Sequence, residues 1–353
     1  DFQHRVPNAE EIPIPSGQVE DELWEIFEAV VNSVKAEDKV VLDVTHSFRS
    51  IPLFVFLAGL YLQKASNVEI QGVYYGAYER DRERCPIFDL TPTLTLIDWL
   101  TATDKFINTG SATELGELLA NIQRDFYRQG RQKYEPVSPR SLISFGNSIQ
   151  AISESIELVR PLKLMNETAE LERIPYDSLK RDVGQFAHPF ALLLDRIQAD
   201  YRQFALSNPR TAQAHQALMK QFDLLHWYVE KSLSAQAILL GREWVVSALC
   251  IGLERSYLNN KERKHIEQGL NQLVEWTKDK ESYPQPFCIN AFEQVVPDLE
   301  ELSAFWSKLR DMRNDLAHTE MRQDSLSAST MTSFVHNELE TKLQNLFKEL
   351  FDN

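Results

Sequence analysis

The sequence is poor in the residues that stabilise secreted and membrane proteins. Only three of its 353 residues are cysteines, Cys85, Cys250 and Cys288, and no short spacing relates them. This argues against a disulfide framework or a zinc ribbon and is typical of a reducing compartment. The longest apolar run, from Ile51 to Leu62, is shorter than the ~18–20 residues that cross a bilayer. We therefore expect a cytoplasmic protein that makes no membrane contact and holds no metal.

Positive charge is also scarce. The chain has 37 Lys and Arg against 52 Asp and Glu, a net charge of −15. Residues 1–100 hold 8 basic and 17 acidic residues (net −9), whereas residues 101–353 hold 29 and 35 (net −6). A chain this acidic has no general attraction for nucleic acid. If the protein handles RNA, it must do so at a local site.

The first hundred residues alternate helical and strand patterns. We expect helices over 19–34 and 50–64, strands over 40–45 and 68–78, and a third strand within 85–96. The helix from Ser50 is apolar nearly all round, so we expect it to be buried. Such alternation predicts an α/β sheet. It amounts to about half of a doubly wound domain, and we therefore expect further residues upstream of Asp1.

Helical periodicity dominates from about residue 97 to the end. Helices are expected over 97–106, 111–128, 141–160, 185–206, 211–255, 261–280, 297–318 and 330–350, with prolines such as Pro161 and Pro175 marking turns. The stretch 124–140 is locally basic, which we interpret as a solvated face or loop in preference to a path for RNA. The predicted domains are residues 1–100 and an all-helical part over residues 101–353, consistent with the length of the chain.

One cluster of polar residues lies where the strand 40–45 ends and the next helix begins. Thr45, His46, Ser47 and Arg49 fall within the segment Asp-Val-Thr-His-Ser-Phe-Arg-Ser-Ile-Pro. Ligands of open α/β sheets bind at this edge, and a helix N-terminus favours phosphate. The segment lacks a Walker-A lysine and a G-x-G-x-x-G motif, which argues against an NTPase or an ordinary dinucleotide enzyme. Alternatively, Thr45 and Ser50 only cap and Arg49 pairs with a surface acid.

A second cluster closes the helix expected over 297–318. It reads Arg313-Asn-Asp-Leu-Ala-His318, an Arg-x4-His pattern that also occurs by chance at Arg210 and His215. The helix carries one apolar stripe, made of Leu302, Phe305, Leu309, Met312 and Leu316. Arg313 lies at the edge of this stripe, and His318 lies ~140° further round an ideal helix. The two side chains could meet across a groove formed by two copies of the helix.

Arg, Asn and His together suit metal-free cleavage of RNA. A histidine transfers protons near neutral pH, and an arginine stabilises charge on phosphorus. The 2′-hydroxyl of RNA is the nucleophile, and Asn314 can hydrogen-bond a phosphate or orient His318. Alternatively, Arg313 pairs with Asp311 or Asp315 and His318 is a surface residue.

The first cluster resembles the signature of CARF domains from type III CRISPR systems. The resemblance extends to the flanking segments 12–17, 22–27 and 72–77. It implies a Rossmann-like domain that binds cyclic oligoadenylate, most often cyclic tetra-adenylate, across a two-fold dimer interface. The ligand-binding residues would be Thr45, His46, Ser47, Phe48 and Arg49. Ser47 stands where many relatives have Gly, and the first strand of the family has no counterpart.

The second cluster resembles the Arg-x4-His motif of HEPN ribonucleases, and the segment from Leu240 to Trp244 resembles another central HEPN helix. Glu243 in that segment could orient the site or form a salt bridge at the core edge. The implied fold is a Rossmann-like α/β CARF domain, with its N-terminal part missing, followed by an all-α HEPN domain. The catalytic residues would be Arg313, His318 and Asn314.

The combined resemblance implies a single-stranded RNA endoribonuclease of antiviral defence. It would act as a homodimer or higher even oligomer, use no cofactor, and be activated by cyclic oligoadenylate. Its products would carry 2′,3′-cyclic phosphate and 5′-hydroxyl ends. Two alternatives remain open. The HEPN-like part could serve only dimerisation, or the protein could be a ring nuclease that degrades cyclic oligoadenylate with the help of His46 or Arg49.

Overall fold

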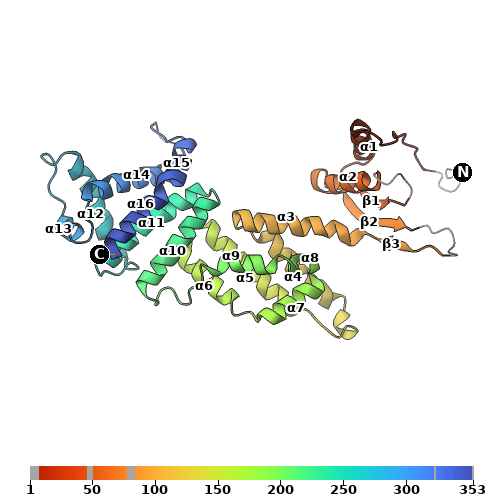
Figure 1. Ribbon diagram of the computed structural model, residues 1–353, viewed down its shortest axis with the longest axis horizontal. Helices are drawn as coiled ribbons and strands as arrows, with labels where there is room; N and C mark the ends of the chain where they lie inside the picture. Colours follow the sequence, from red (N-terminus) through yellow and green to blue (C-terminus); the bar gives the residue numbers. More distant parts are fainter. Residues whose placement is uncertain (1–7, 46–50, 78–83, 322, 352–353) are drawn as a thin grey trace. The chain divides into compact units, whose positions relative to one another are not determined.

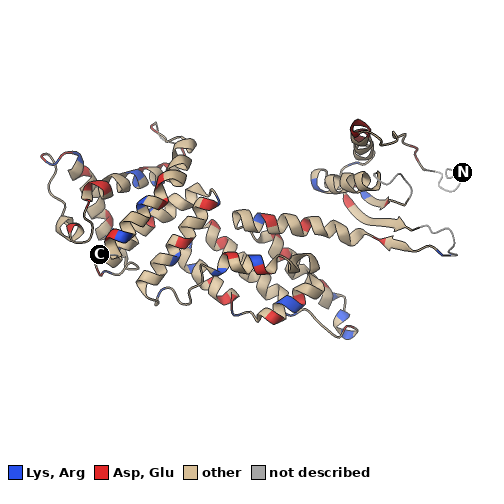
Figure 2. Cartoon of the chain, in the orientation of Figure 1, with Lys and Arg blue, Asp and Glu red and all other residues tan. Residues whose placement is uncertain are grey.

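The computed structural model describes residues 8–45, 51–77, 84–321 and 323–351 (Figure 1). Its internal contacts divide the chain into two compact units, Asp1–Leu100 and Thr101–Asn353. Acidic residues are spread over the helices of both units (Figure 2). The two units are described separately below.

The first unit contains a small sheet with two helices. Strands β1 (Lys39–Asp43) and β2 (Glu69–Gly76) are parallel and are joined through helix α2 (Ile51–Ala65), as the alternation predicts. Strand β3 (Ile87–Asp89) pairs antiparallel with β2, so the order is β1-β2-β3. Helix α1 (Glu20–Asn32) packs against α2.

The sheet and α2 meet around a glycine. Residues that form this core include Leu42, Leu60, Ile70 and Val73. A Cβ atom at Gly59 would lie 2.7 Å from Leu42 Cδ1, so a larger residue here would force the Leu42 side chain to move. The core therefore depends on a close approach between helix and strand.

Two predictions for this unit are wrong in part. Helix α2 is buried on one side only, because Leu53, Leu57 and Tyr61 are 64%, 53% and 50% exposed. The described sheet and α1 cover a single face of α2, and an apolar composition does not show how many faces are covered. The third strand ends at Asp89, and after a 3₁₀ turn (Thr91–Thr93) helix α3 (Leu94–Thr109) already begins.

The described part of the second unit is helical, which confirms the predicted helical domain. After α3 the helices are α4 (Thr113–Arg128), α5 (Leu142–Glu157), α6 (Pro161–Leu171), α7 (Tyr176–Phe186), α8 (His188–Ala191), α9 (Leu194–Arg202), α10 (Ala214–Glu230), α11 (Ser234–Gly252), α12 (Asn260–Lys278), α13 (Ile289–Glu293), α14 (Leu299–His318), α15 (Ala328–Phe334) and α16 (Glu340–Phe351). A 3₁₀ turn lies at Arg131–Lys133, and a π-helical turn, Val335–Leu339, joins α15 to α16.

Prolines and one serine explain where the predicted helices differ from the observed ones. The sequence predicted turns at Pro161 and Pro175. Instead, Pro161 is the first residue of α6 and Pro175 is the N-cap of α7, so each proline begins a helix. The single helix expected over 211–255 is divided into α10 and α11, because Ser232 adopts a left-handed conformation with φ 57°. The two helices then pack against each other.

Helix α11 lies at the centre of the C-terminal helices. It contacts α10, α12, α14 and α16. Among the described helices, α11 is long and apolar enough to cross a membrane, but 67% of its apolar window is buried inside the protein. Such burial is what a core helix requires.

Candidate functional site

The first polar cluster is described only at its beginning. Thr45 follows β1, and its Oγ1 accepts a hydrogen bond of 2.7 Å from the backbone N–H of Gly76 at the end of β2. The Thr45 N–H donates to Asp43 Oδ1 at 2.9 Å. Thr45 therefore joins the carboxyl ends of two parallel strands, at the edge where ligands of such sheets bind. His46, Ser47, Phe48 and Arg49 lie outside the described residues.

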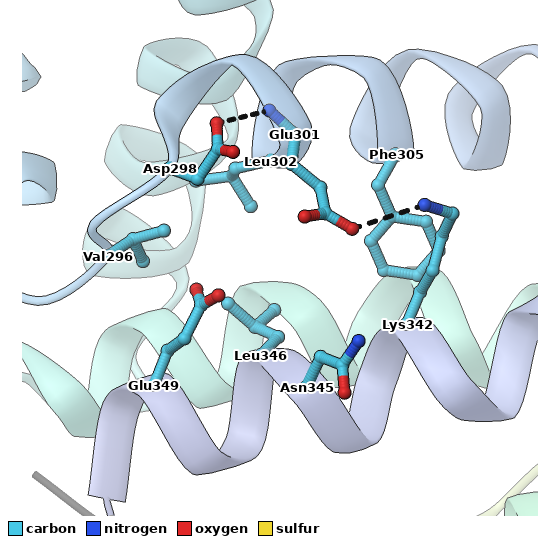
Figure 3. A pocket seen from close by; sticks show the side chains of 9 residues that line it. All are labelled: Val296, Asp298, Glu301, Leu302, Phe305, Lys342, Asn345, Leu346 and Glu349. Carbon is cyan, nitrogen blue, oxygen red and sulfur yellow. Dashed lines mark hydrogen bonds and ion pairs between the residues drawn. The ribbon is translucent and has the colours of Figure 1, made fainter.

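The second cluster lies on α14, whose beginning is fixed by polar contacts. The side chain of Asp298 accepts a hydrogen bond of 2.9 Å from the Glu301 N–H, and Glu301 pairs with Lys342 of α16 at 3.3 Å (Figure 3). A narrow cavity lies between α14 and α16, and the side chain of Glu349 points into it beside Asp298 and Glu301. Burial, together with the carboxylates of Glu301 and Asp298, raises the pKa of Glu349. These contacts attach the first turn of α14 to α16.

The apolar stripe of α14 is buried largely as predicted. Leu302, Phe305, Leu309 and Met312 are buried. Leu316, expected to continue the stripe, is only half-buried, and Asp315 is buried in its place with 4% exposure. Asp315 lies three residues after Met312, on the same face of the helix, and this spacing is the feature of the sequence that indicates its burial.

An ion-pair cluster around one buried arginine connects α14 to its neighbours. Arg242 of α11 is 4% exposed, and its guanidinium lies 4.9 Å from the centre of the Trp306 ring of α14. It donates to Glu243 Oε1 at 2.6 Å and to Glu267 of α12. Glu243 also accepts a bond of 2.6 Å from Arg263. Glu243 thus forms salt bridges at the edge of the core, one of the two roles considered for it.

Arg313 and Asn314 lie near the end of α14 and are half-buried. The Arg313 Nη1 group donates a hydrogen bond of 3.0 Å to Asn314 Oδ1. Other cations of the same helix are paired, since Lys308 binds Glu338 at 2.8 Å and Arg310 lies 3.3 Å from Asp311. Among the described residues no carboxylate pairs with Arg313, which leaves its charge available to an anion.

The buried Asp315 fixes the segment that follows α14. Its Oδ2 accepts a hydrogen bond of 3.3 Å from the Leu326 N–H, while its Oδ1 is buried and has no hydrogen-bond partner in the described chain. An unsatisfied buried carboxylate oxygen is costly. Because Asp315 follows Asn314 directly in the chain, it is a candidate positioning residue.

His318 is the last residue of α14 and is exposed. The next two residues, Thr319 and Glu320, both adopt left-handed conformations, with φ 48° and 64°. Left-handed residues also follow α10 (Ser232) and α11 (Glu254), so these conformations mark the end of the helix. They turn the chain sharply, and the Met321 N–H donates to the His318 carbonyl at 2.9 Å.

Within a single chain, the arginine and the histidine of the predicted catalytic cluster are not linked. Among the described side chains, no hydrogen bond connects Arg313 to His318. The other Arg-x4-His match is divided as well, since His215 packs against Phe347 and Phe351 with ring centres 5.3 and 5.0 Å away. In the described ranges there is also no group of three or more metal-ligating side chains.

The middle of the chain is similar to part of a known protein family. Residues 95–209, from α3 to the turn before α10, match the family model for the second domain of CRISPR-associated protein MJ1674. The similarity is to a CRISPR-associated protein. The match contains neither of the two polar clusters.

The full relative shows the same similarity over a longer stretch. CRISPR-associated protein MJ1674 of Methanocaldococcus jannaschii is 29% identical over 182 residues, which is 50% of this chain and 25% of the relative. The chain therefore spans about a quarter of the length of that relative. The resemblance to CRISPR proteins noted from the two motifs is supported at this level.

Proposed function

We propose that the protein is an antiviral CRISPR ribonuclease that cleaves single-stranded RNA with Arg313, Asn314 and His318. The observation that carries this proposal is the Arg313 guanidinium. Asn314 holds it, and no carboxylate of the described chain neutralises it, although Lys308 and Arg310 of the same helix are both paired. A half-buried cation without a counter-ion suits a phosphate group.

The chemistry requires two protons to move and one phosphorus bond to be exchanged. The RNA 2′-hydroxyl loses its proton to a base and attacks the adjacent phosphorus. The bond from phosphorus to the 5′-oxygen breaks, and the leaving oxygen takes a proton. His318 is exposed and suits these proton transfers, while Arg313 stabilises the added negative charge. The products carry a 2′,3′-cyclic phosphate and a 5′-hydroxyl, and the reaction requires no metal.

The distance round the helix favours a site made by two chains. Arg313 and His318 are five residues apart, which separates them by ~140° on an ideal helix. Two copies of α14 facing each other could bring the arginine of one towards the histidine of the other. The active form is then a homodimer or a higher even oligomer.

A cyclic oligoadenylate, such as cyclic tetra-adenylate, would regulate this site from the first unit. Its phosphates and riboses would bind near Thr45 and the segment 46–49. Thr45 supports this proposal because its side chain joins the ends of β1 and β2. The activator must bind the active state more tightly than the resting state. Similarity to a CRISPR-associated protein also favours a cytoplasmic location, where foreign RNA is met.

The proposal is tested by an RNA cleavage assay in EDTA with a panel of cyclic oligoadenylates. We expect His318→Ala and Arg313→Ala each to lower the activated rate by about 100-fold or more, since each removes a catalytic group. His336→Ala and Arg310→Ala are the matched controls, because His336 is an exposed histidine elsewhere and Arg310 is already paired. Both should stay within about twofold of the parent.

Other outcomes separate the alternatives. If cleavage by His318→Ala equals that of the parent, the assignment of His318 is wrong and RNA is cleaved at another site. If the parent cleaves no RNA with any cyclic oligoadenylate, a sensor with a dimerisation domain is favoured. If labelled cyclic tetra-adenylate is degraded while RNA is not, the protein is a ring nuclease.

A further inference from the structure

A pocket in the second unit lies away from α14 and is not used by the proposed function. It has a volume of about 430 Å³ and lies where the beginning of α6, the turn before α10, and helices α11 and α12 meet. Three arginines, Arg160, Arg210 and Arg263, line it, and we call it the arginine pocket. Its volume is within the ~300–1,000 Å³ range of small-molecule sites.

The charge of the pocket is opposite to that of the chain. Glu243 is the one carboxylate among its described lining residues, so the lining carries three positive charges and one negative charge. That carboxylate is already occupied, because its two oxygens accept hydrogen bonds of 2.6 Å each from Arg242 and Arg263. The pocket is therefore locally positive in a chain whose net charge is −15.

Two of the three arginines are available to a ligand. The side chains of Arg160 and Arg210 are exposed, and neither makes an ion pair or hydrogen bond within the described ranges. Arg263 is different, since it donates to Ser247 Oγ at 2.8 Å and to the Tyr257 carbonyl at 2.9 Å. It is therefore a fixed cation at the wall of the pocket.

Tyr257 shows that Arg210 and Arg263 act on the same place. Its hydroxyl donates to the Pro209 carbonyl at 3.3 Å, directly beside Arg210. Burial raises the pKa of Tyr257, while the positive charges of Arg210 and Arg263 act in the opposite direction. Both guanidinium groups thus lie close enough to influence one buried hydroxyl.

The position of Arg160 is fixed by the backbone. Val159 before it has φ 51°, a left-handed conformation that is strained for a β-branched residue. The Arg160 N–H donates to the Ser155 carbonyl at 2.7 Å and closes this turn. Pro161 and Leu162, at the start of α6, also line the pocket, and no side chain caps that end of the helix. The partial positive charge of the helix adds to that of the arginines.

We propose that the arginine pocket binds a small phosphate-bearing anion, with the phosphate held between Arg160 and Arg210. A guanidinium donates two parallel hydrogen bonds to phosphate oxygens, and two of them match the double charge of a phosphomonoester. The apolar wall formed by Leu240 and Leu258 suits an organic portion of the ligand. The phosphate group can therefore come from inorganic phosphate or from a nucleotide.

Titration calorimetry on the full chain tests this proposal with two probes, inorganic phosphate and adenosine monophosphate. We expect one-to-one binding of at least one probe. We also expect Arg160→Ala and Arg210→Ala each to weaken it by tenfold or more, with Arg210→Lys losing less than Arg210→Ala. Arg128→Ala is the matched control, because Arg128 is an exposed arginine on α4 that pairs with Asp125. It should leave the affinity unchanged.

The two probes separate the sources of the phosphate. Equal affinities for phosphate and the nucleotide assign the pocket to phosphate itself, and a tenfold preference for the nucleotide assigns it to nucleotides. The proposal is overturned if neither probe binds at millimolar concentration, or if Arg160→Ala and Arg210→Ala bind like Arg128→Ala. Displacement of phosphate by single-stranded RNA without a terminal phosphate overturns the assignment to a small ligand. None of these measurements depends on RNA cleavage, so the ribonuclease proposal is tested separately.

Discussion

Arg242 is the buried residue that connects α11 and α12 to the helix carrying Arg313 and His318. We predict that Arg242→Ala destabilises the second unit and displaces α14. The side chain is 4% exposed and lies against the Trp306 ring at 4.9 Å. Its removal empties a volume that no neighbour can fill without moving.

The size of the effect follows from three contributions. The contact of a desolvated guanidinium with an indole ring is worth about 1–2 kcal/mol. Loss of the apolar part of the side chain adds about 1–2 kcal/mol. The ion pairs add less, about 1 kcal/mol, since the Glu243 and Glu267 side chains are 52% and 37% exposed and water screens them. We therefore expect a loss of about 3–5 kcal/mol.

Urea unfolding followed by circular dichroism measures this loss, and a methionine variant separates its causes. Arg242→Met keeps most of the volume and removes an Nε–H that is buried without a partner among the described residues, so it should lose only about 1 kcal/mol. Arg128→Ala, an exposed control, should change the free energy of unfolding by less than about 0.5 kcal/mol. A loss below about 1 kcal/mol for Arg242→Ala, or an equal loss for both Arg242 variants, would refute the packing argument.

Two further predictions concern α5 and α7. A Cβ atom at Gly146 of α5 would lie 2.9 Å from the Gly116 carbonyl oxygen, so Gly146→Ala should lower the free energy of unfolding by about 1–3 kcal/mol. Gly184 of α7 has open space around it, so Gly184→Ala should raise the free energy of unfolding by up to about 1 kcal/mol, and thermal melting compares the two variants. Burial opposes ionisation of Asp182, but hydrogen bonds from the Arg140 N–H and from Ser141 outweigh it and lower its pKa. The stability that Asp182 contributes is therefore present above the ordinary carboxyl pKa and is lost as the pH falls through the lowered pKa. Asp182→Asn should then be less stable than the parent at neutral pH and approach the stability of the parent in acid. Unfolding at several pH values measures this difference.

Local patterns in the sequence predicted much of the secondary structure. The strand–helix–strand unit β1–α2–β2 and the helix α14 follow from runs of apolar residues whose spacing is that of the element itself. The prolines were harder to interpret, since Pro161 and Pro175 begin helices as readily as they end them. The boundary of a helix depends on the next turn as well as on the proline.

The candidate sites show where sequence patterns stop being informative. Arg313 and Asn314 are adjacent in the chain, and their hydrogen bond lies within one motif. The arginine pocket draws on Arg160, Arg210 and Arg263, which are about fifty residues apart, so only the folded chain brings them together. The locally basic stretch 124–140 contains pairs such as Arg131 with Glu135 at 2.7 Å, which neutralise each other on the surface.

The π-helical turn at Val335–Leu339 lets one continuous helix meet two different partners. A regular α-helix would keep a single face towards the core from α15 to α16. The wider turn adds about one residue, which changes the rotation of everything that follows. Glu338 in this turn thereby reaches Lys308 of α14 at 2.8 Å, while Leu350 beyond it packs beside Gly252 of α11. The direction in which the side chains of α16 point is thus set independently of α15. A one-residue deletion in the π-helical turn would rotate every side chain of α16 away from its present partner.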